Sequence, residues 1–217
     1  VIAATPKRES PRDVLVSRRG WTFDRLPEGA TIGTASIRRA RQLAIHCPDI
    51  EVVGLRGNVD TRVKKALSGE VDAVVIAEAG LRRLGRYRRY AKPMPTDAFI
   101  PSAGQGILAI EARASDRFAR KIAASIQNAD AGFEAAAERE CLRTLHGGCR
   151  VPVGIHAKVK GRELTVRAGV YSVHHTEALT VRMSGNRKSA ARLGREAAQI
   201  LLRQGAGDYL REARRHR

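Results

Sequence analysis

The sequence predicts two units of different class: an α/β domain with a parallel or mixed sheet, followed by a smaller α+β domain toward the C-terminus. Apolar, strand-like segments alternate with helix-like segments through the first hundred residues, which is the pattern of βαβ units. After about residue 128 the order changes to helix, strands, helix. Hydrophobic residues make up 43% of the 217, enough to fill a core.

Three strand-and-helix pairs follow one another between residues 31 and 84. In chain order, the expected strands and helices are Thr31–Ala35, Ser36–Cys47, Glu51–Leu55, Val59–Leu67, Val71–Ala77 and Ala79–Leu84. Pro48 stops the first helix, because proline cannot continue one. The third strand is a continuous apolar run of the type that lies buried in parallel sheets.

A single strand-and-helix unit follows in residues 101–127. Ile107–Glu111 predicts a strand and Ser115–Gln127 predicts a helix. One strand and one helix cannot bury themselves, so this unit needs a sheet supplied from elsewhere.

The remaining residues predict the α+β domain. A helix over Phe133–Leu145 ends at two glycines. The strands Val151–Val159 and Glu163–Tyr171 are expected to pair, and an amphipathic helix over Ser189–Gln204 closes the unit. We expect the basic tail, Arg211–Arg217, to be a solvated and frayed end.

The charge of the chain indicates an acidic partner. Lys and Arg number 40 against 22 Asp and Glu, a net charge of +18. Aromatic residues at 4% argue against a base-stacking surface, although the stretch Arg82–Tyr90 interleaves tyrosines with arginines and leaves RNA binding open beside a solvated helix end. No apolar run is long enough for a membrane span. Three widely spaced cysteines form no disulfide framework, which favours the cytoplasm.

Arginine occurs at each of the three strand-to-helix junctions. The residues concerned are Thr34, Ser36, Arg38 and Arg39 at the first junction, Arg56, Gly57 and Arg62 at the second, and Ala77, Arg82 and Arg83 at the third. Ligands of open α/β sheets bind outside the carboxyl ends of the strands. Helix N-termini and guanidinium groups both favour anions there. Because converging arginines repel one another, we expect a multiply anionic ligand in this crevice.

Two alternatives stay open for these arginines. Arginine is abundant in the chain, so some helix starts would carry it by composition alone. The ligand could be a nucleotide, a sugar phosphate or an organic acid, although no GxGxxG or GxxxxGK[ST] motif is present.

Cys149 is expected on a tight, exposed loop, since Gly147–Gly148 ends one helix and Pro152 begins an extended segment. Arg150 beside it would favour the reactive thiolate. A covalent role and a passive loop cysteine are both compatible with this pattern. His146 and Cys149 have a metal-like spacing, but no second pair accompanies them, so we expect no metal.

Several motifs resemble those of porphobilinogen deaminase, also called hydroxymethylbilane synthase. The motifs are KRESPRDVLVS (Lys7–Ser17), GTASIRR (Gly33–Arg39), LRGNVDTR (Leu55–Arg62), AEAGLRRLG (Ala77–Gly85), PSAGQGILAIE (Pro101–Glu111) and LHGGCRVPVG (Leu145–Gly154). They occur in the order and spacing of that family and cover essentially the whole chain.

The resemblance implies a cytoplasmic, monomeric enzyme of tetrapyrrole and heme biosynthesis. Such an enzyme joins four porphobilinogen molecules head to tail with release of ammonia, giving hydroxymethylbilane. It carries a dipyrromethane cofactor on a cysteine through a thioether, and Cys149 is the matching residue. It binds neither nucleic acid nor membranes, and it needs no metal.

The resemblance also implies roles for the junction residues. Each pyrrole carries an acetate and a propionate, so the growing chain is a polycarboxylate. The cofactor would be held by Thr34, Ser36, Arg38, Arg39, Arg56, Gly57 and Arg62, and the substrate by Arg83, Gln105 and Ala77. Gln105 is expected in the cleft between domains. Ala35 stands where the family often has serine, and Arg150 where glutamine is common.

A departure from the family concerns its first domain. Nothing in the sequence matches the family segment that bears the catalytic aspartate, so the catalytic residue is not assigned, and we expect negligible turnover by this chain alone. Residues 1–5 and 101–127 are then a remnant of domain 1, residues 6–100 are domain 2 with the anion crevice, and residues 128–217 are domain 3 with the cysteine loop. Domain 2 is expected to resemble a lobe of a periplasmic binding protein.

Two rival functions remain. A non-catalytic module that binds polycarboxylates has no need of a modified thiol at Cys149. A basic RNA-binding protein predicts a nucleic-acid affinity that falls steeply with salt.

Overall fold

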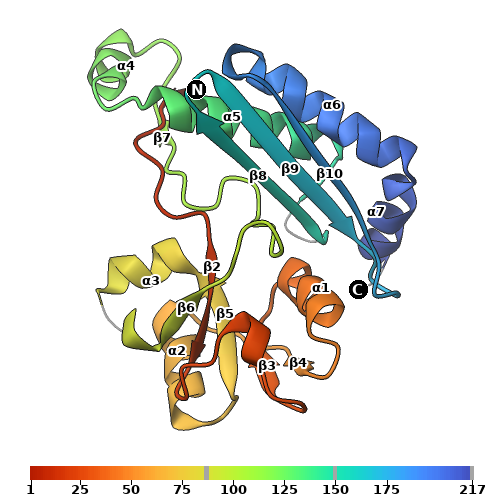
Figure 1. Cartoon of the computed structure of the whole chain (residues 1–217). Coiled ribbons are helices and arrows are strands. Elements are labelled where there is room, and N and C mark those ends of the chain that lie inside the picture. Colours follow the sequence, from red (N-terminus) through yellow and green to blue (C-terminus); the bar gives the residue numbers. More distant parts are fainter. Residues whose placement is uncertain (86–87, 149–150, 216–217) are drawn as a thin grey trace.

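The computed structural model describes residues 1–85, 88–148 and 151–215. It contains an α/β unit with a five-stranded sheet, an α+β unit with a three-stranded sheet, and a small two-stranded sheet near the N-terminus. Figure 1 shows the two larger units one above the other, joined by the extended segments before β2 and after β6. No helix in the described ranges is long and apolar enough to cross a membrane.

The five-stranded sheet is mixed, with strand order β4-β3-β5-β2-β6. Its strands are β2 (Asp13–Ser17), β3 (Thr31–Gly33), β4 (Glu51–Val53), β5 (Ala73–Ala77) and β6 (Ala91–Pro93). The strands β4, β3 and β5 run parallel, while β2 is antiparallel to both β5 and β6. The helices are α1 (Ile37–His46), α2 (Val59–Ser68) and α3 (Glu78–Leu84).

Both faces of this sheet are buried. Val14, Val16, Val74 and Ile76 pack on one side with residues of α2 and α3. Leu15 and other alternate residues of β2 and β5 pack on the opposite side with residues of α1. Because successive strand side chains point to opposite faces, two covered faces require the continuous apolar runs seen in β2 and β5.

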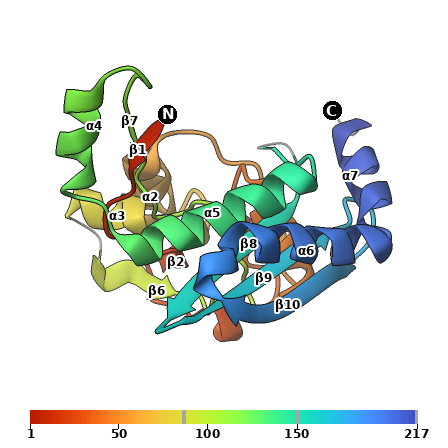
Figure 2. The same ribbon diagram turned by 90° about the horizontal axis from the view of Figure 1, so that it is seen from above.

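The α+β unit has a three-stranded antiparallel sheet covered on one face. It consists of α5 (Ala129–Thr144), β8 (Val153–Lys160), β9 (Glu163–Tyr171), β10 (Ala178–Asn186), α6 (Ala190–Arg203) and α7 (Ala206–Arg215), with strand order β10-β9-β8. Figure 2 shows α5 and α6 lying together along the sheet. A Cβ on Gly194 of α6 would lie 2.1 Å from the carbonyl oxygen of Ala137, so only glycine permits this close helix contact.

The third and smallest part contains residues from both stretches that the sequence assigns to a remnant of domain 1, residues 1–5 and 101–127. β1 (Ile2–Ala4) pairs antiparallel with β7 (Ile110–Glu111), and α4 (Arg117–Ala124) packs against β1. Short 3-10 helices span Phe23–Arg25, Arg88–Tyr90 and Arg187–Ser189.

Most of the predicted elements are confirmed, with ends that shift by a few residues. The strand Glu163–Tyr171 has the predicted bounds. The tail prediction was wrong: α7 is helical to Arg215, because Leu210 and Ala213 are buried in the C-terminal core. The strands β2 and β10 were not among the predicted elements.

Candidate functional site

The three arginine-bearing junctions lie at one edge of the five-stranded sheet. β3 is hydrogen-bonded in parallel to β4 on one side and to β5 on the other. The carboxyl ends of all three strands therefore meet at the same edge, where Thr34, Arg56 and Glu78 follow them. The arrangement predicted from the sequence is confirmed for the backbone of these junctions.

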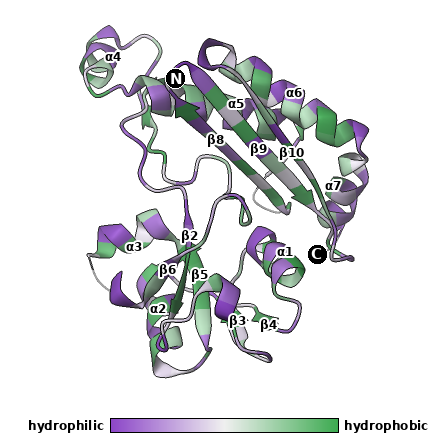
Figure 3. Cartoon of the chain, viewed as in Figure 1, coloured by the Kyte–Doolittle hydropathy of each residue, from purple (hydrophilic) through white to green (hydrophobic). Residues whose placement is uncertain are grey.

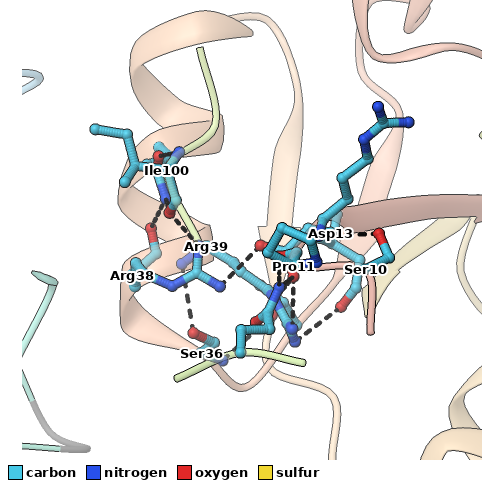
Figure 4. Close-up of polar contacts among 12 residues, drawn as sticks. Ser10, Pro11, Asp13, Ser36, Arg38, Arg39 and Ile100 are labelled. Atoms are coloured by element: carbon cyan, nitrogen blue, oxygen red, sulfur yellow. Dashed lines mark hydrogen bonds and ion pairs between the residues drawn. The ribbon is translucent and has the colours of Figure 1, made fainter. Parts of the chain in front are cut away.

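At this edge the side chains of Arg38 and Arg39 converge on Asp13, at the start of β2 (Figure 4). Arg38 Nη2 donates to Asp13 Oδ2 at 2.8 Å, and its Nη1 donates to the carbonyl oxygen of Ile100 at 2.7 Å. Arg39 donates from Nε and Nη2 to Asp13 Oδ1 at 3.0 and 2.7 Å. The Asp13 side chain is fully buried, so this is a buried carboxylate between two guanidinium groups.

The charge balance of this group keeps Asp13 ionised. Burial would raise the pKa of Asp13, but the charges of Arg39 and Arg38 and their hydrogen bonds outweigh it and hold the pKa below the ordinary value. Burial lowers the pKa of Arg38, which Asp13 opposes. We call Asp13, Arg38 and Arg39 the Asp13 cluster; with Asp13 ionised it carries a net positive charge.

Thr34 and Ser36 shape the start of α1. The Ser36 hydroxyl accepts from the amide of Arg39 at 3.4 Å as the N-cap, and the Thr34 hydroxyl accepts from the amide of Ser36 at 3.2 Å. These hydroxyls fix the helix start in register with Arg38 and Arg39. They also use amide groups that the sequence analysis expected to face a ligand.

Gln105 joins the Asp13 cluster to the other unit. Its Nε2 donates to the Pro11 carbonyl at 2.6 Å and to Asp13 Oδ1 at 3.1 Å. The backbone carbonyl oxygen of Gln105 accepts from Arg8 Nε and Nη2 at 3.1 and 2.9 Å. Gln105 thus bridges Asp13 and Arg8, while its place in a cleft between domains stays a prediction.

Arg8 belongs to a second buried ion cluster, with Glu134 and Glu138 of α5. Arg8 Nη1 lies 3.2 Å from Glu134 Oε2 and 2.7 Å from Glu138 Oε1. The same carboxylates accept from the amides of Val159 and Ala157 on the edge strand β8, at 3.0 and 2.7 Å. We call these residues the Arg8 cluster; it satisfies the free edge of the C-terminal sheet and attaches the N-terminal segment to it.

A cavity of about 280 Å³ lies between the start of α1 and the described residues Gly148, Val151 and Val153. It is lined by Ser36, Ile37, Arg38, Ser102, Ala103, Leu142, Gly148, Val151 and Val153. Cys149 and Arg150 lie outside the described residues, but their neighbours Gly148 and Val151 belong to the cavity wall. The cavity therefore lies between the first junction and the described residues that flank Cys149 in the sequence.

The other predicted residues do not join the cluster, and Arg83 lies in the last turn of α3 rather than at the strand end. Within the described ranges, the side chains of Arg56, Arg62 and Arg83 form no hydrogen bond or ion pair with it. Arg62 Nε is buried and has no hydrogen-bond partner there. Gly57 has φ of +124°, which favours glycine. Ala77 pairs with Asp13 across the β2–β5 ladder.

Sequence reasoning missed Asp13 and Arg8 as organising residues. The only local signal was their position inside the motif Lys7–Ser17. Asp13 removes the expected need for a ligand to separate Arg38 from Arg39, because the chain supplies its own anion between them.

Family models match both parts of the chain. Residues 1–121 match the porphobilinogen deaminase, dipyromethane cofactor binding domain, and residues 133–203 match the porphobilinogen deaminase, C-terminal domain. The chain belongs to the porphobilinogen deaminase family. Relatives named porphobilinogen deaminase agree: that of Syntrophobacter fumaroxidans is 41% identical over 97% of this chain and 68% of its own length, and that of Brevibacillus brevis 41% over 99% and 69%. A probable porphobilinogen deaminase of Nitrosopumilus maritimus is 40% identical over 96% of this chain and 67% of its own length.

The residues around the cavity fit the dipyrromethane cofactor of this family. A cofactor that bears carboxylates needs donors and positive charge, and the net positive Asp13 cluster borders the cavity through Arg38. Two N–H groups of Arg38 are used internally, and a guanidinium has more to donate. The unpartnered Arg62 Nε is a further donor at the same sheet edge.

Proposed function

We propose that this chain supplies the cofactor site of a hydroxymethylbilane synthase, whose reaction is the head-to-tail condensation of four porphobilinogen molecules with release of ammonia. Negligible turnover by this chain alone stays a prediction from the sequence. The single observation that carries the proposal is the cavity between the start of α1 and the segment around Cys149. Its position supports a thiol-bound cofactor whose carboxylates face the arginine junctions. When bound through a thioether, the dipyrromethane would supply the pyrrole to which porphobilinogen is joined.

The chain's own residues bind and orient in this proposal. Arg38 and Arg39 present positive charge at a fixed place, because Asp13 and the helix cap hold their guanidinium groups. Thr34, Ser36, Arg56, Gly57 and Arg62 belong with them in the cofactor site. Arg83, Gln105 and Ala77 are assigned to the growing polypyrrole. These assignments rest on the family motifs and on the shared sheet edge.

The domain division follows the same proposal. We assign residues 1–5 and 101–127 to one domain, residues 6–100 to the cofactor-binding α/β domain and residues 128–217 to the domain that carries Cys149. A monomer in the cytoplasm, acting without nucleic acid or a membrane, stays a prediction from the sequence.

The mass of the intact protein tests the cofactor assignment. We expect the purified chain to exceed its bare mass by one dipyrromethane, and the increment to vanish in Cys149→Ser. Cys47→Ser is the matched control, because Cys47 is a free, half-buried thiol that the proposal does not use. Cys141 cannot substitute readily, since burial and the charge of Glu138 raise its pKa to about 12. An increment that survives Cys149→Ser would contradict the assignment.

A non-catalytic polycarboxylate-binding module remains the second candidate, supported by the cationic cluster beside the cavity. Titration with a small polycarboxylate separates the two. A module keeps its affinity in Cys149→Ser and shows no mass increment in the unaltered chain, whereas the enzyme shows the increment.

A further inference from the structure

The outer face of the C-terminal sheet carries a row of basic side chains. The core side of β9 is apolar, and polar residues such as Thr165 and Arg167 alternate with the core residues along the strand. Figure 3 shows hydrophilic and hydrophobic residues interspersed along β8, β9 and β10. In the strand register His156 lies opposite Arg167, and Arg167 lies opposite Arg182. Like charges directly opposite each other on one sheet face destabilise the pairing. This row therefore needs negative charge from elsewhere.

The chain supplies only part of that charge. Asp97 forms an ion pair with Arg167, and its own side chain is 74% exposed at the rim. Lys158 approaches Glu134 at 3.7 Å around the sheet edge. Lys160 and Arg182 form no ion pair within the described ranges. Glu163 lies opposite Lys160 in the strand register without forming an ion pair with it there, whereas Arg182 lies opposite Arg167 and has no carboxylate paired with it in the described part of the chain.

A cavity of about 240 Å³ is formed over this row. Four cationic side chains and one carboxylate line it, with two threonines and a histidine: Lys158, Lys160, Arg167, Arg182, Asp97, Thr96, Thr165 and His156. His156 is 9% exposed, and its Nε2 is buried without a hydrogen-bond partner among the described residues. A buried nitrogen without a partner is costly, and His156 is one of the residues that line this cavity.

The imidazole is suited to donate rather than to add charge. Burial, reinforced by Arg8, Lys158 and Arg167, lowers the pKa of His156 to about 3, so the ring is neutral near pH 7. A neutral imidazole carries one N–H and adds no positive charge to the cavity. The cavity thus combines a neutral donor with guanidinium, ammonium and hydroxyl donors.

We propose that this face binds a compact, multiply charged oxyanion of the phosphate type, held by Lys160, Arg167, Arg182 and His156. An arginine fork, a lysine point charge and a hydroxyl together match the clustered oxygens of a phosphate group. None of these residues belongs to the cofactor site proposed above.

Titration of the purified protein with inorganic phosphate at low ionic strength, followed by calorimetry, tests the site. The double variant Lys160→Gln/Arg182→Gln is expected to bind at least about tenfold more weakly, since two charge-assisted hydrogen bonds are lost. The control Lys121→Gln/Arg203→Gln removes the same net charge from exposed residues of α4 and α6 and is expected to stay within about twofold. Equal weakening in both variants, or none in either, overturns the proposal.

A variant that is expected to bind phosphate more tightly separates loss of the site from a general loss of structure. Asp97→Asn removes the carboxylate that competes for Arg167 and is expected to tighten phosphate binding, whereas Asp49→Asn, on an exposed loop, is expected to leave it unchanged. Weaker binding by Asp97→Asn overturns the proposal.

Two further readouts fix the ligand and its place. Phosphate should shift the ring signals of His156 in an NMR titration, assigned by comparison with His156→Gln, and an unmoved His156 signal contradicts the site. Citrate at the same charge should bind more weakly than phosphate. Only the citrate binding that is lost in Lys160→Gln/Arg182→Gln counts for this site, and tighter binding of citrate than of phosphate by that measure would overturn the assignment to a phosphate-type anion.

Discussion

The Asp13 cluster and the Arg8 cluster both combine carboxylates with arginines, but in opposite proportions. One places a buried carboxylate between two arginines, and the other places an arginine between two buried glutamates. The two glutamate carboxylates also accept hydrogen bonds from backbone amides of β8 and from the amide of Gly104. The arginines of the Asp13 cluster keep donors beside a cavity. A saturated cluster holds the fold together, whereas an unsaturated cationic one can also receive an anion.

The largest effect is expected from breaking the Arg8 cluster. Arg8→Gln leaves Glu134 and Glu138 facing each other in a buried site, and we expect the free energy of unfolding to fall by about 3–5 kcal/mol. Urea unfolding measures the change. Arg203→Gln, an exposed arginine on α6, is the control and should change stability by less than about 0.5 kcal/mol. A loss below about 1 kcal/mol for Arg8→Gln would mean that the glutamates do not depend on it.

Breaking the Asp13 cluster is expected to cost less stability. In Asp13→Asn the amide oxygen can still accept from Arg39, but the amide nitrogen then faces Arg38 Nη2. We expect a loss of about 2–3 kcal/mol in urea unfolding, with Asp49→Asn as the exposed control. Added polycarboxylate should restore part of the loss, because the arginines of the variant lack their internal anion. A ligand with no effect on this variant would contradict an anion site beside Arg38.

The two clusters also differ in how they respond to acid. The pKa of Asp13 is lowered, so its contribution is present above its unfolded value near 4 and is lost as pH falls through the lower folded value. Burial raises the pKa of Glu138 despite Arg8, so its contribution has the opposite sign and falls as pH rises. Glu138 is present in both the unaltered chain and Asp13→Asn, so its contribution cancels in the gap between their free energies of unfolding.

That gap should be constant from pH 7 to about 5 and shrink below pH 4, as Asp13 takes up a proton. The largest value of this gap is the loss of unfolding free energy seen in Asp13→Asn at neutral pH. Urea unfolding of both proteins across this range measures it. A gap that widens in acid would show that Asp13 is not stabilised in its ionised form.

Sequence reasoning predicted the junctions well and the clusters poorly, for a physical reason. Junction residues such as Ser36 and Arg56 are fixed by local periodicity, which places each strand end beside a helix start. Arg8 and Glu138 are 130 residues apart, and Arg38 is 25 residues from Asp13. No local pattern links such partners. Only the known motif around Lys7–Ser17 marked that segment as special.

The missed strands show the same limit. β10 was not predicted, although its residues alternate between half-buried and exposed. One face of β10 packs on the core and the other lies on the outer face of the sheet, so no continuous apolar run marks it. β2 was hidden because its first residue is the charged Asp13, whose burial depends on arginines supplied by α1.

The smallest effect, and the sharpest test of whether the clusters communicate, concerns Gln105. Gln105→Ala removes the side-chain bonds to Pro11 and Asp13 but keeps the carbonyl oxygen that Arg8 uses, and we expect a loss of about 1–2 kcal/mol. Gln204→Ala on the surface is the control. In double-variant cycles Gln105→Ala should be coupled to Asp13→Asn by at least about 0.5 kcal/mol and be additive with Arg8→Gln. Strong coupling to Arg8→Gln would instead show that the side chain of Gln105 links the two clusters into one network.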